Sequence, residues 1–143
     1  MIDSRLTLHH VGCLVQTIEG ALDSYSAMGF KVSGGAGVNV GSQKVRLCFL
    51  SAGSGTLIEL VEPAEDNRFL RRLLGKGVNF YHLGFQCSDL DLTLDTMTRQ
   101  GGRILIRFHS EAFEGRECVF VLTPLGQMVE LIQAASGLAL HGT

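Results

Sequence analysis

The stretch HVGCLVQTIEGALDSYSAMGFKV, residues 10–32, occurs a second time in the chain in altered form. Its counterpart, 72 positions later, is HLGFQCSDLDLTLDTMTRQGGRI, residues 82–104. An alignment without gaps places histidine on histidine at 10 and 82, and glycine on glycine at 12 and 84. Aspartates coincide at 23 and 95, and glycines again at 29 and 101. The conserved order and spacing indicate an internal repeat.

The repeat continues with a shift of 71 positions. Phe49 then falls on Phe120, and IELV at 58–61 falls on VELI at 129–132. The chain is therefore predicted to hold two copies of a unit of about seventy residues. We expect a single domain over 1–143, with repeats at about 6–63 and 79–134. The stretch RFLRRLLGKG predicts a linking helix over 65–77 that ends at glycine.

Each repeat has the pattern strand, helix and three strands. In the first copy, Ile18, Leu22 and Tyr25 have helical spacing, and Gly29 ends the helix. In the second copy the corresponding positions are Leu90, Leu94, Met97 and Gly101, and Asp89 or Ser88 is the expected N-cap. The fold class is therefore α+β, built from two tandem βαβββ modules.

Composition excludes several classes of protein. The chain has 143 residues, 45% of them hydrophobic and 18% charged, with a net charge of -2. The charge gives no basic surface for nucleic acid, and no apolar run reaches the length of a membrane span. The first five residues lack the layout of a secretory signal, so we expect a soluble, cytoplasmic protein. The four cysteines form no CxxC pair and are expected to be reduced core residues: Cys13, Cys48, Cys87 and Cys118.

Two histidines and two glutamates occupy equivalent positions of the repeats. Side chains alternate along a strand, so His10 shares a face with Gly12, and His82 shares one with Gly84. Glu59 and Glu130 lie inside apolar runs, where a carboxylate is costly unless it is paired. Two matched pairs favour one shared partner, and we predict a divalent cation: Zn, Ni, Co, Mn or Fe.

Histidines and glutamates in strands also have an interpretation that involves no metal. A single histidine or glutamate in a strand is more often solvent-facing or hydrogen-bonded than a ligand, and only the repeat favours the ligand assignment. His9 alternates to the opposite face and is expected to pack against the helix. His109, in a predicted loop, and His141, in the tail, are expected to be solvated.

Four motifs relate the chain to a known family. They are HHVG at 9–12, IELVEP at 58–63, YHLGF at 81–85 and VELIQ at 129–133. In this order the sequence resembles the vicinal oxygen chelate (glyoxalase, bleomycin resistance, dioxygenase) superfamily. The resemblance implies a curved mixed sheet around a metal site, a homodimer, and metal ligands at the four positions selected above.

Two enzymes of the superfamily are compatible with the sequence. FLRRLLGKGVNFYHLGF at 69–85 and EGRECVFVLTP at 114–124 are similar to methylmalonyl-CoA epimerase. The epimerase often has glutamine where Glu59 stands, and some members carry a second acid on the strand where Arg46 and Leu47 offer none. Two histidines with two glutamates are the set of glyoxalase I, but its usual glutathione-binding arginine is missing from IEGALDSYS at 18–26.

Both activities share the removal of a proton next to a thioester or carbonyl. The resemblance favours Glu130 as the base, with Glu59 as the alternative, and a small-molecule substrate of the acyl-CoA or glutathione hemithioacetal class. Neither nucleic acid nor membrane is an expected partner. A non-catalytic, antibiotic-binding protein is the alternative from another class. A basic stripe on the linking helix suits either coenzyme A phosphates or solvent: Arg68, Arg71, Arg72 and Lys76.

Overall fold

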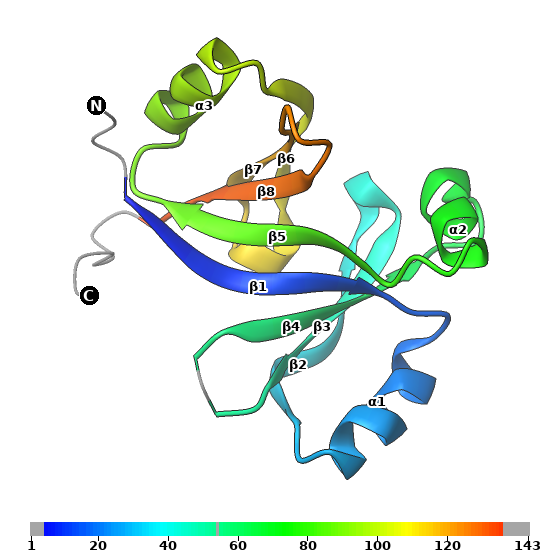
Figure 1. Cartoon of the computed structure of the whole chain (residues 1–143). Helices are drawn as coiled ribbons and strands as arrows, with labels where there is room; N and C mark the ends of the chain where they lie inside the picture. The colour runs from blue at the N-terminus through cyan, green and yellow to red at the C-terminus, as the bar shows by residue number, and fades with distance from the viewer. Residues whose placement is uncertain (1–4, 54, 136–143) are drawn as a thin grey trace. The chain divides into compact units, whose positions relative to one another are not determined.

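The computed structural model describes residues 5–53 and 55–135. They divide into two compact units, which we call the N-terminal unit (10–81) and the C-terminal unit (5–9 with 82–135). Each unit contains a mixed four-stranded arrangement with a helix on one face, so the α+β class with βαβββ modules is confirmed (Figure 1). None of the described helices has the length and apolar character of a membrane span.

The N-terminal unit has the strand order β2-β3-β4-β1. Its elements are β1 (Leu6–Leu14, from residue 10), α1 (Ile18–Ala27), β2 (Lys31–Val40), β3 (Val45–Ser51), β4 (Leu57–Pro63) and α2 (Arg68–Gly75). A 3-10 turn, η1 (Gly41–Gln43), joins β2 to β3. β1 and β4 are parallel, and the other neighbours are antiparallel. The first and last strands of the module are therefore adjacent, at one edge of its strand order.

The C-terminal unit repeats this order as β5-β8-β7-β6. Its elements are β5 (Phe80–Cys87, from residue 82), α3 (Leu90–Arg99), β6 (Arg103–Ser110), η2 (Glu111–Phe113), β7 (Arg116–Leu122) and β8 (Met128–Gln133). β5 and β8 are parallel, as β1 and β4 are in the other unit. The repeat in the sequence thus corresponds to a repeat in strand pairing.

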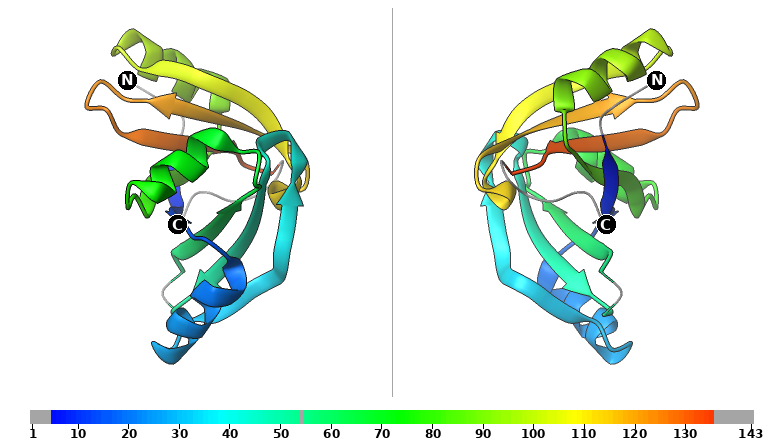
Figure 2. Two further views of the ribbon diagram at one scale, coloured as in Figure 1. Left: turned by 90° about the vertical axis from the view of Figure 1, so that its right-hand side faces the viewer. Right: turned by 90° about the vertical axis from the view of Figure 1, so that its left-hand side faces the viewer.

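Helices α1 and α3 each pack on their own unit, as the apolar spacing predicted (Figure 2). Ile18 of α1 is buried against a core that includes Leu50 and Leu60, and Leu90 and Leu94 of α3 lie in the second core. Asp89 caps α3, because its side chain accepts a hydrogen bond from the Leu92 amide at 3.0 Å. Burying one such leucine contributes about 1.5–3 kcal/mol, so these few residues fix each helix to its sheet.

An equivalent side-chain contact is made by the first residue of α1 and by the first residue of α3. Glu62 Oε1, near the end of β4, accepts a hydrogen bond from the Ile18 amide at 2.8 Å. Gln133 Oε1, at the end of β8, accepts one from the Leu90 amide at 2.9 Å. An amide in the first turn has no partner within its own helix, so each contact satisfies one such donor and joins helix to strand.

Two expectations from the sequence are corrected, and the ring that His9 contacts is identified. The linking helix covers 68–75 and not 65–77, because Asn67 caps it by accepting a hydrogen bond from the Leu70 amide. The His9 ring meets Phe113 of η2 edge-on, with the centroids 5.2 Å apart. His109 lies in strand β6 and not in a loop, although it is exposed as expected. His141 and the tail lie outside the described residues.

All four cysteines are free and buried, which confirms their expected role. Burial raises the pKa of the Cys87 thiol to about 11, and it also raises the pKa values of Cys13 and Cys48. Because the thiolate is the reactive species, we expect Ellman's reagent at pH 8 to modify no cysteine rapidly in the folded protein. All four should react once guanidinium has unfolded the chain. A thiol that reacts at the rate of a free one in the folded protein would contradict this burial.

The same buried groups predict a loss of stability in alkali. Burial, with a contact to Cys13, raises the pKa of Tyr25 from 10.0 to about 12, and the pKa of Cys87 rises from 9.0 to about 11. Between about pH 9 and 12 the folded protein therefore holds more protons than the unfolded chain, and its stability falls as the pH rises. Urea unfolding at several pH values should show this decline, and Tyr25→Phe should make it shallower. A free energy of unfolding that stays constant over this range would refute the prediction.

Candidate metal centre

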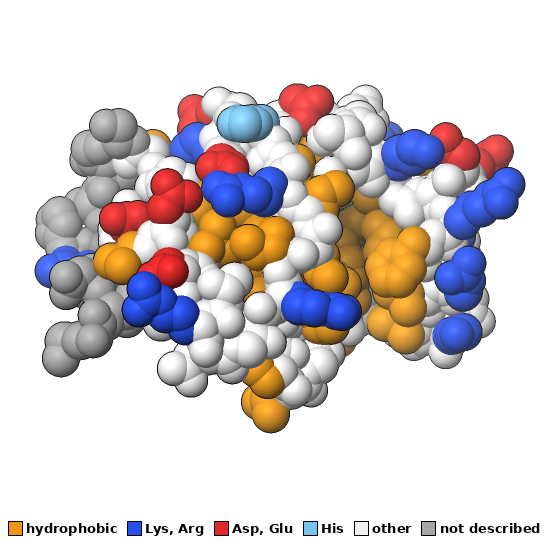
Figure 3. All heavy atoms as spheres, turned by 90° about the horizontal axis from the view of Figure 1, so that it is seen from above, with side chains coloured by type: hydrophobic (Ala, Val, Ile, Leu, Met, Phe, Trp, Pro, Cys, Tyr) orange, Lys and Arg blue, Asp and Glu red, His pale blue; other side chains and the backbone are white. Residues whose placement is uncertain are grey.

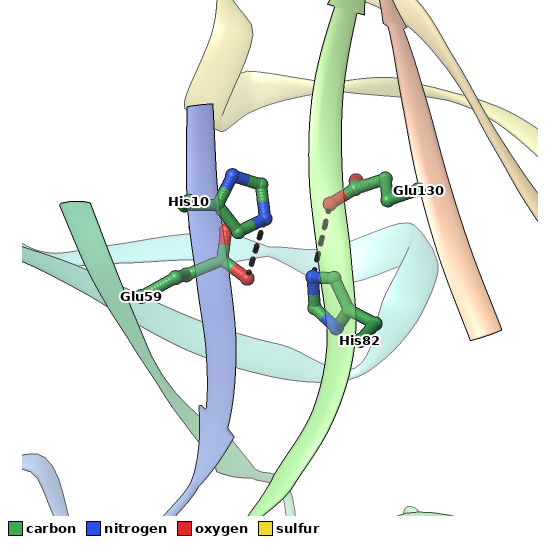
Figure 4. Close-up of side chains that lie close together, drawn as sticks. All are labelled: His10, Glu59, His82 and Glu130. Carbon is green, nitrogen blue, oxygen red and sulfur yellow. Dashed lines mark ion pairs between the residues drawn. The ribbon is translucent and has the colours of Figure 1, made fainter. Parts of the chain in front are cut away.

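The first candidate pair lies on two parallel strands of the N-terminal unit. His10 is on β1 and Glu59 is on β4, where Glu59 is the register partner of Gly12. His10 Nε2 lies 3.5 Å from Glu59 Oε1, and the two residues are 0% and 2% exposed. Figure 4 shows the two side chains pointing toward each other. The strand pairing thus places an imidazole and a carboxylate together, away from solvent.

The second pair repeats this geometry in the C-terminal unit. His82 is on β5 and Glu130 is on β8, where Glu130 is the register partner of Gly84. His82 Nε2 lies 3.2 Å from Glu130 Oε1, and both residues are buried (Figure 4). In both units, therefore, the histidine lies two residues before the glycine that is the register partner of the glutamate.

An aromatic ring borders each pair. Phe49 meets the His10 ring edge-on at 5.7 Å, and Phe120 meets the His82 ring edge-on at 5.1 Å. Each phenylalanine is also the register partner of the glutamate on the neighbouring strand. Phe108 stacks on Phe120 at 5.8 Å. Such apolar surroundings strengthen electrostatic interactions, because fewer water dipoles screen the charges. The sequence had aligned Phe49 with Phe120, but gave no reason to assign them to the site.

Strand β3 adds no carboxylate to the face that holds the first pair. Leu47 alternates to the same face as Phe49 and is buried. Arg46 points to the opposite side, where its guanidinium contacts Glu19 at 2.7 Å and Glu62 at 3.0 Å. That contact holds the pKa of Glu19 below its usual value. The sequence prediction that this strand supplies no base therefore agrees with the side-chain positions.

The chemistry of the donors suits a divalent cation. A buried carboxylate is costly unless a charge or hydrogen-bond donor compensates it, and each glutamate has one buried imidazole beside it. All four residues are buried, and each pair offers one imidazole nitrogen and one carboxylate as ligands. Imidazole and carboxylate are ordinary ligands of zinc, nickel, cobalt, manganese and iron. The residues present therefore fit the metal that the sequence predicted.

The basic stripe of α2 separates into two groups. Arg71 is held within the unit, since it donates to the Pro63 carbonyl, to Gln16 Oε1 at 3.1 Å and to the Ala64 carbonyl. This residue ties α2 to the end of β4, so the interpretation of Arg71 as a ligand-binding or solvated residue is corrected. The other three members are exposed: Arg68, Arg72 and Lys76.

Comparison with known families agrees with this architecture. The family model described as the glyoxalase/bleomycin resistance protein/dioxygenase superfamily matches residues 9–120, which cover β2–β6 completely and parts of β1 and β7. The chain belongs to this superfamily. The two βαβββ modules of this chain are therefore compared with those of other superfamily members.

Several individual proteins are similar to this superfamily member. The uncharacterised protein YqjC of Bacillus subtilis (strain 168) is 31% identical over 118 residues, covering 80% of this chain and 81% of YqjC. Methylmalonyl-CoA epimerase from Mycobacterium tuberculosis is 26% identical, with a TM-score of 0.74, covering 90% of this chain and 87% of the epimerase. A Streptomyces coelicolor methylmalonyl-CoA epimerase variant in complex with 2-nitronate-propionyl-CoA is 26% identical, with a TM-score of 0.75, covering 94% and 99% of the two chains.

Proposed function

We propose that this protein is a metal-dependent isomerase or lyase that removes a proton next to a thioester or carbonyl, similar to methylmalonyl-CoA epimerase. In this proposal His10, Glu59, His82 and Glu130 hold one divalent cation together. The observation that carries the proposal is the occurrence of two buried histidine–glutamate pairs at equivalent positions of two modules. A protein that only needed a stable sheet would gain more from apolar residues at these positions.

The proposed chemistry divides between the cation and the protein. A bound divalent cation supplies Lewis-acid stabilisation of the negative charge that develops on a carbonyl oxygen. Glu130 takes the proton from the adjacent carbon, and Glu59 is the alternative base. The rings of Phe49 and Phe120 keep water away from the two pairs, which preserves the strength of these charge interactions.

An acyl-CoA thioester is the substrate class that we propose first. The support is the similarity to two methylmalonyl-CoA epimerases over most of the chain. Lactoylglutathione lyase activity of the glyoxalase I type is a second candidate, favoured by the donor set of two histidines and two glutamates and by Leu47, which leaves β3 without a base. A non-catalytic antibiotic-binding role is disfavoured, because a binder of apolar or neutral ligands has no use for two buried carboxylates.

Metal analysis with two exchange assays tests this function. We expect one divalent cation per chain, and solvent deuterium should enter methylmalonyl-CoA in the presence of the protein. Incorporation only with methylglyoxal and glutathione would replace the first candidate by the second. A purified protein that holds no divalent cation after supplementation, and exchanges neither substrate, would overturn the enzymatic proposal. The predicted cytoplasmic homodimer is tested separately, by sedimentation and by cell fractionation.

A further inference from the structure

The outer face of helix α2 carries a concentration of positive charge. Arg68, Arg72 and Lys76 are exposed, and none of them forms an ion pair with another residue in the described ranges 5–53 and 55–135. They follow one another at intervals of four residues, a spacing at which like charges on a helix destabilise each other. The whole chain has a net charge of -2, so this excess is local. Among the described residues, therefore, no ion pair accounts for these three cations.

An exposed aromatic ring accompanies the cations. Phe69 on the same helix is 53% exposed, and it lies next to Arg68 and three residues before Arg72. In Figure 3, Lys and Arg side chains gather at the right-hand side, where Figure 1 places α2, beside exposed hydrophobic side chains. Cations beside a flat apolar ring suit a ligand that combines phosphate groups with a purine base.

Two contacts tie α2 and the segment after it to the strands that carry the first histidine–glutamate pair. The Leu14 amide donates to the carbonyl of Asn79, just after the helix, at 2.7 Å, and Arg71 binds the Pro63 carbonyl. Leu14 follows His10 by four strand residues, and Pro63 follows Glu59 by four. Four strand residues span roughly 13 Å, so both anchor points, Leu14 and Pro63, lie about that far along their strands from the pair.

We propose that Arg68, Arg72 and Lys76 bind the phosphate groups of a coenzyme A thioester, with Phe69 against its adenine ring. The inference rests on the proposed function and names the part of the substrate that α2 recognises. The pantetheine arm has about the backbone length of four extended residues, roughly 14 Å. It can therefore place its thioester near His10 and Glu59 while the phosphates remain at α2.

Charge distinguishes coenzyme A from glutathione at this surface. The phosphate groups of coenzyme A carry between about three and four negative charges at neutral pH, which three unpaired cations can match. Arginine can bind a phosphate through two parallel hydrogen bonds. Glutathione has only carboxylates and an ammonium group, and it has no ring for Phe69. The outer face of α2 therefore favours the acyl-CoA class over the glutathione class.

The test uses the double variant Arg68→Glu/Arg72→Glu with Lys31→Glu as the control. Lys31 is exposed and pairs with Ser51, at the opposite end of β3 from Val45 and Pro63, so it lies far from α2 within the unit. Isothermal titration with coenzyme A should show an affinity reduced by about ten- to a hundredfold in the double variant and unchanged in the control. Adenosine 3′,5′-bisphosphate should show the same selective loss. Equal affinities for wild type and double variant would overturn the inference.

A truncated substrate separates this inference from the proposed function. The double variant should have a higher KM for methylmalonyl-CoA than wild type. The N-acetylcysteamine thioester of methylmalonate has no phosphates, so the double variant and wild type should convert it at the same rate. Equal losses with both substrates would show that α2 acts through the fold, and would refute the inference. Selective loss of coenzyme A binding without any proton exchange would support this inference and refute the proposed activity. If the double variant kept full proton exchange and an unaltered KM, the proposed activity would be supported and this inference would be refuted.

Discussion

Replacing Glu130 by glutamine is expected to slow the exchange of the substrate α-proton with solvent deuterium by about a hundred- to ten-thousand-fold. Glutamine has nearly the same shape as glutamate, so the packing of β8 beside β5 is retained. The amide cannot accept a proton, however, and the reaction loses its base. The measurement is deuterium incorporation into methylmalonyl-CoA, followed by mass spectrometry at saturating substrate.

Two further variants make this result specific. Glu114→Gln removes an exposed carboxylate from the turn before β7 and should leave the rate within about twofold of wild type. Glu59→Gln distinguishes the two candidate bases. At equal metal content, the variant that lacks the base should show the greater loss of exchange rate. Undiminished exchange in the Glu130→Gln protein would rule out Glu130 as the base.

Replacing either His10 or His82 by alanine is expected to lower metal affinity by more than about a hundredfold. Loss of a group that merely orients a ligand typically costs about ten- to a hundredfold, and in the proposed site a ligand itself would be removed. Each change also leaves a buried glutamate without its neighbouring imidazole, which weakens the folded protein. Because the two pairs are equivalent by repeat and geometry, the two variants should lose metal to a similar degree.

The measurement is the number of divalent cations per chain after dialysis, with affinity obtained by chelator competition. His109→Ala provides a matched control, since His109 is an exposed histidine of strand β6. It should retain the metal content of wild type. The shared-ion hypothesis would be refuted if one histidine variant lost all its metal and the other retained it fully, because the pairs would then be independent.

The modular plan could be predicted from the order of the amino acids alone. The repeat is visible because both copies keep the apolar spacing of a helix and the alternation of a strand, and these patterns depend only on local geometry. Leu90 and Leu94 are buried on α3, and Asp89 caps it, as local rules predicted. The repeat placed His10 and His82 at equivalent positions, and likewise Glu59 and Glu130. That all four hold one ion is still a prediction.

The partners of the polar side chains, in contrast, could be identified only from the folded chain. Arg71 and Arg72 are neighbours in one basic run, yet Arg71 binds the end of β4 while Arg72 is exposed. The His9 ring meets Phe113, a residue more than a hundred positions away, and no local pattern contains that pairing. Local periodicity fixes which face a side chain takes. The group it meets there depends on strand register and on turns distant in the chain, which packing of the whole unit selects.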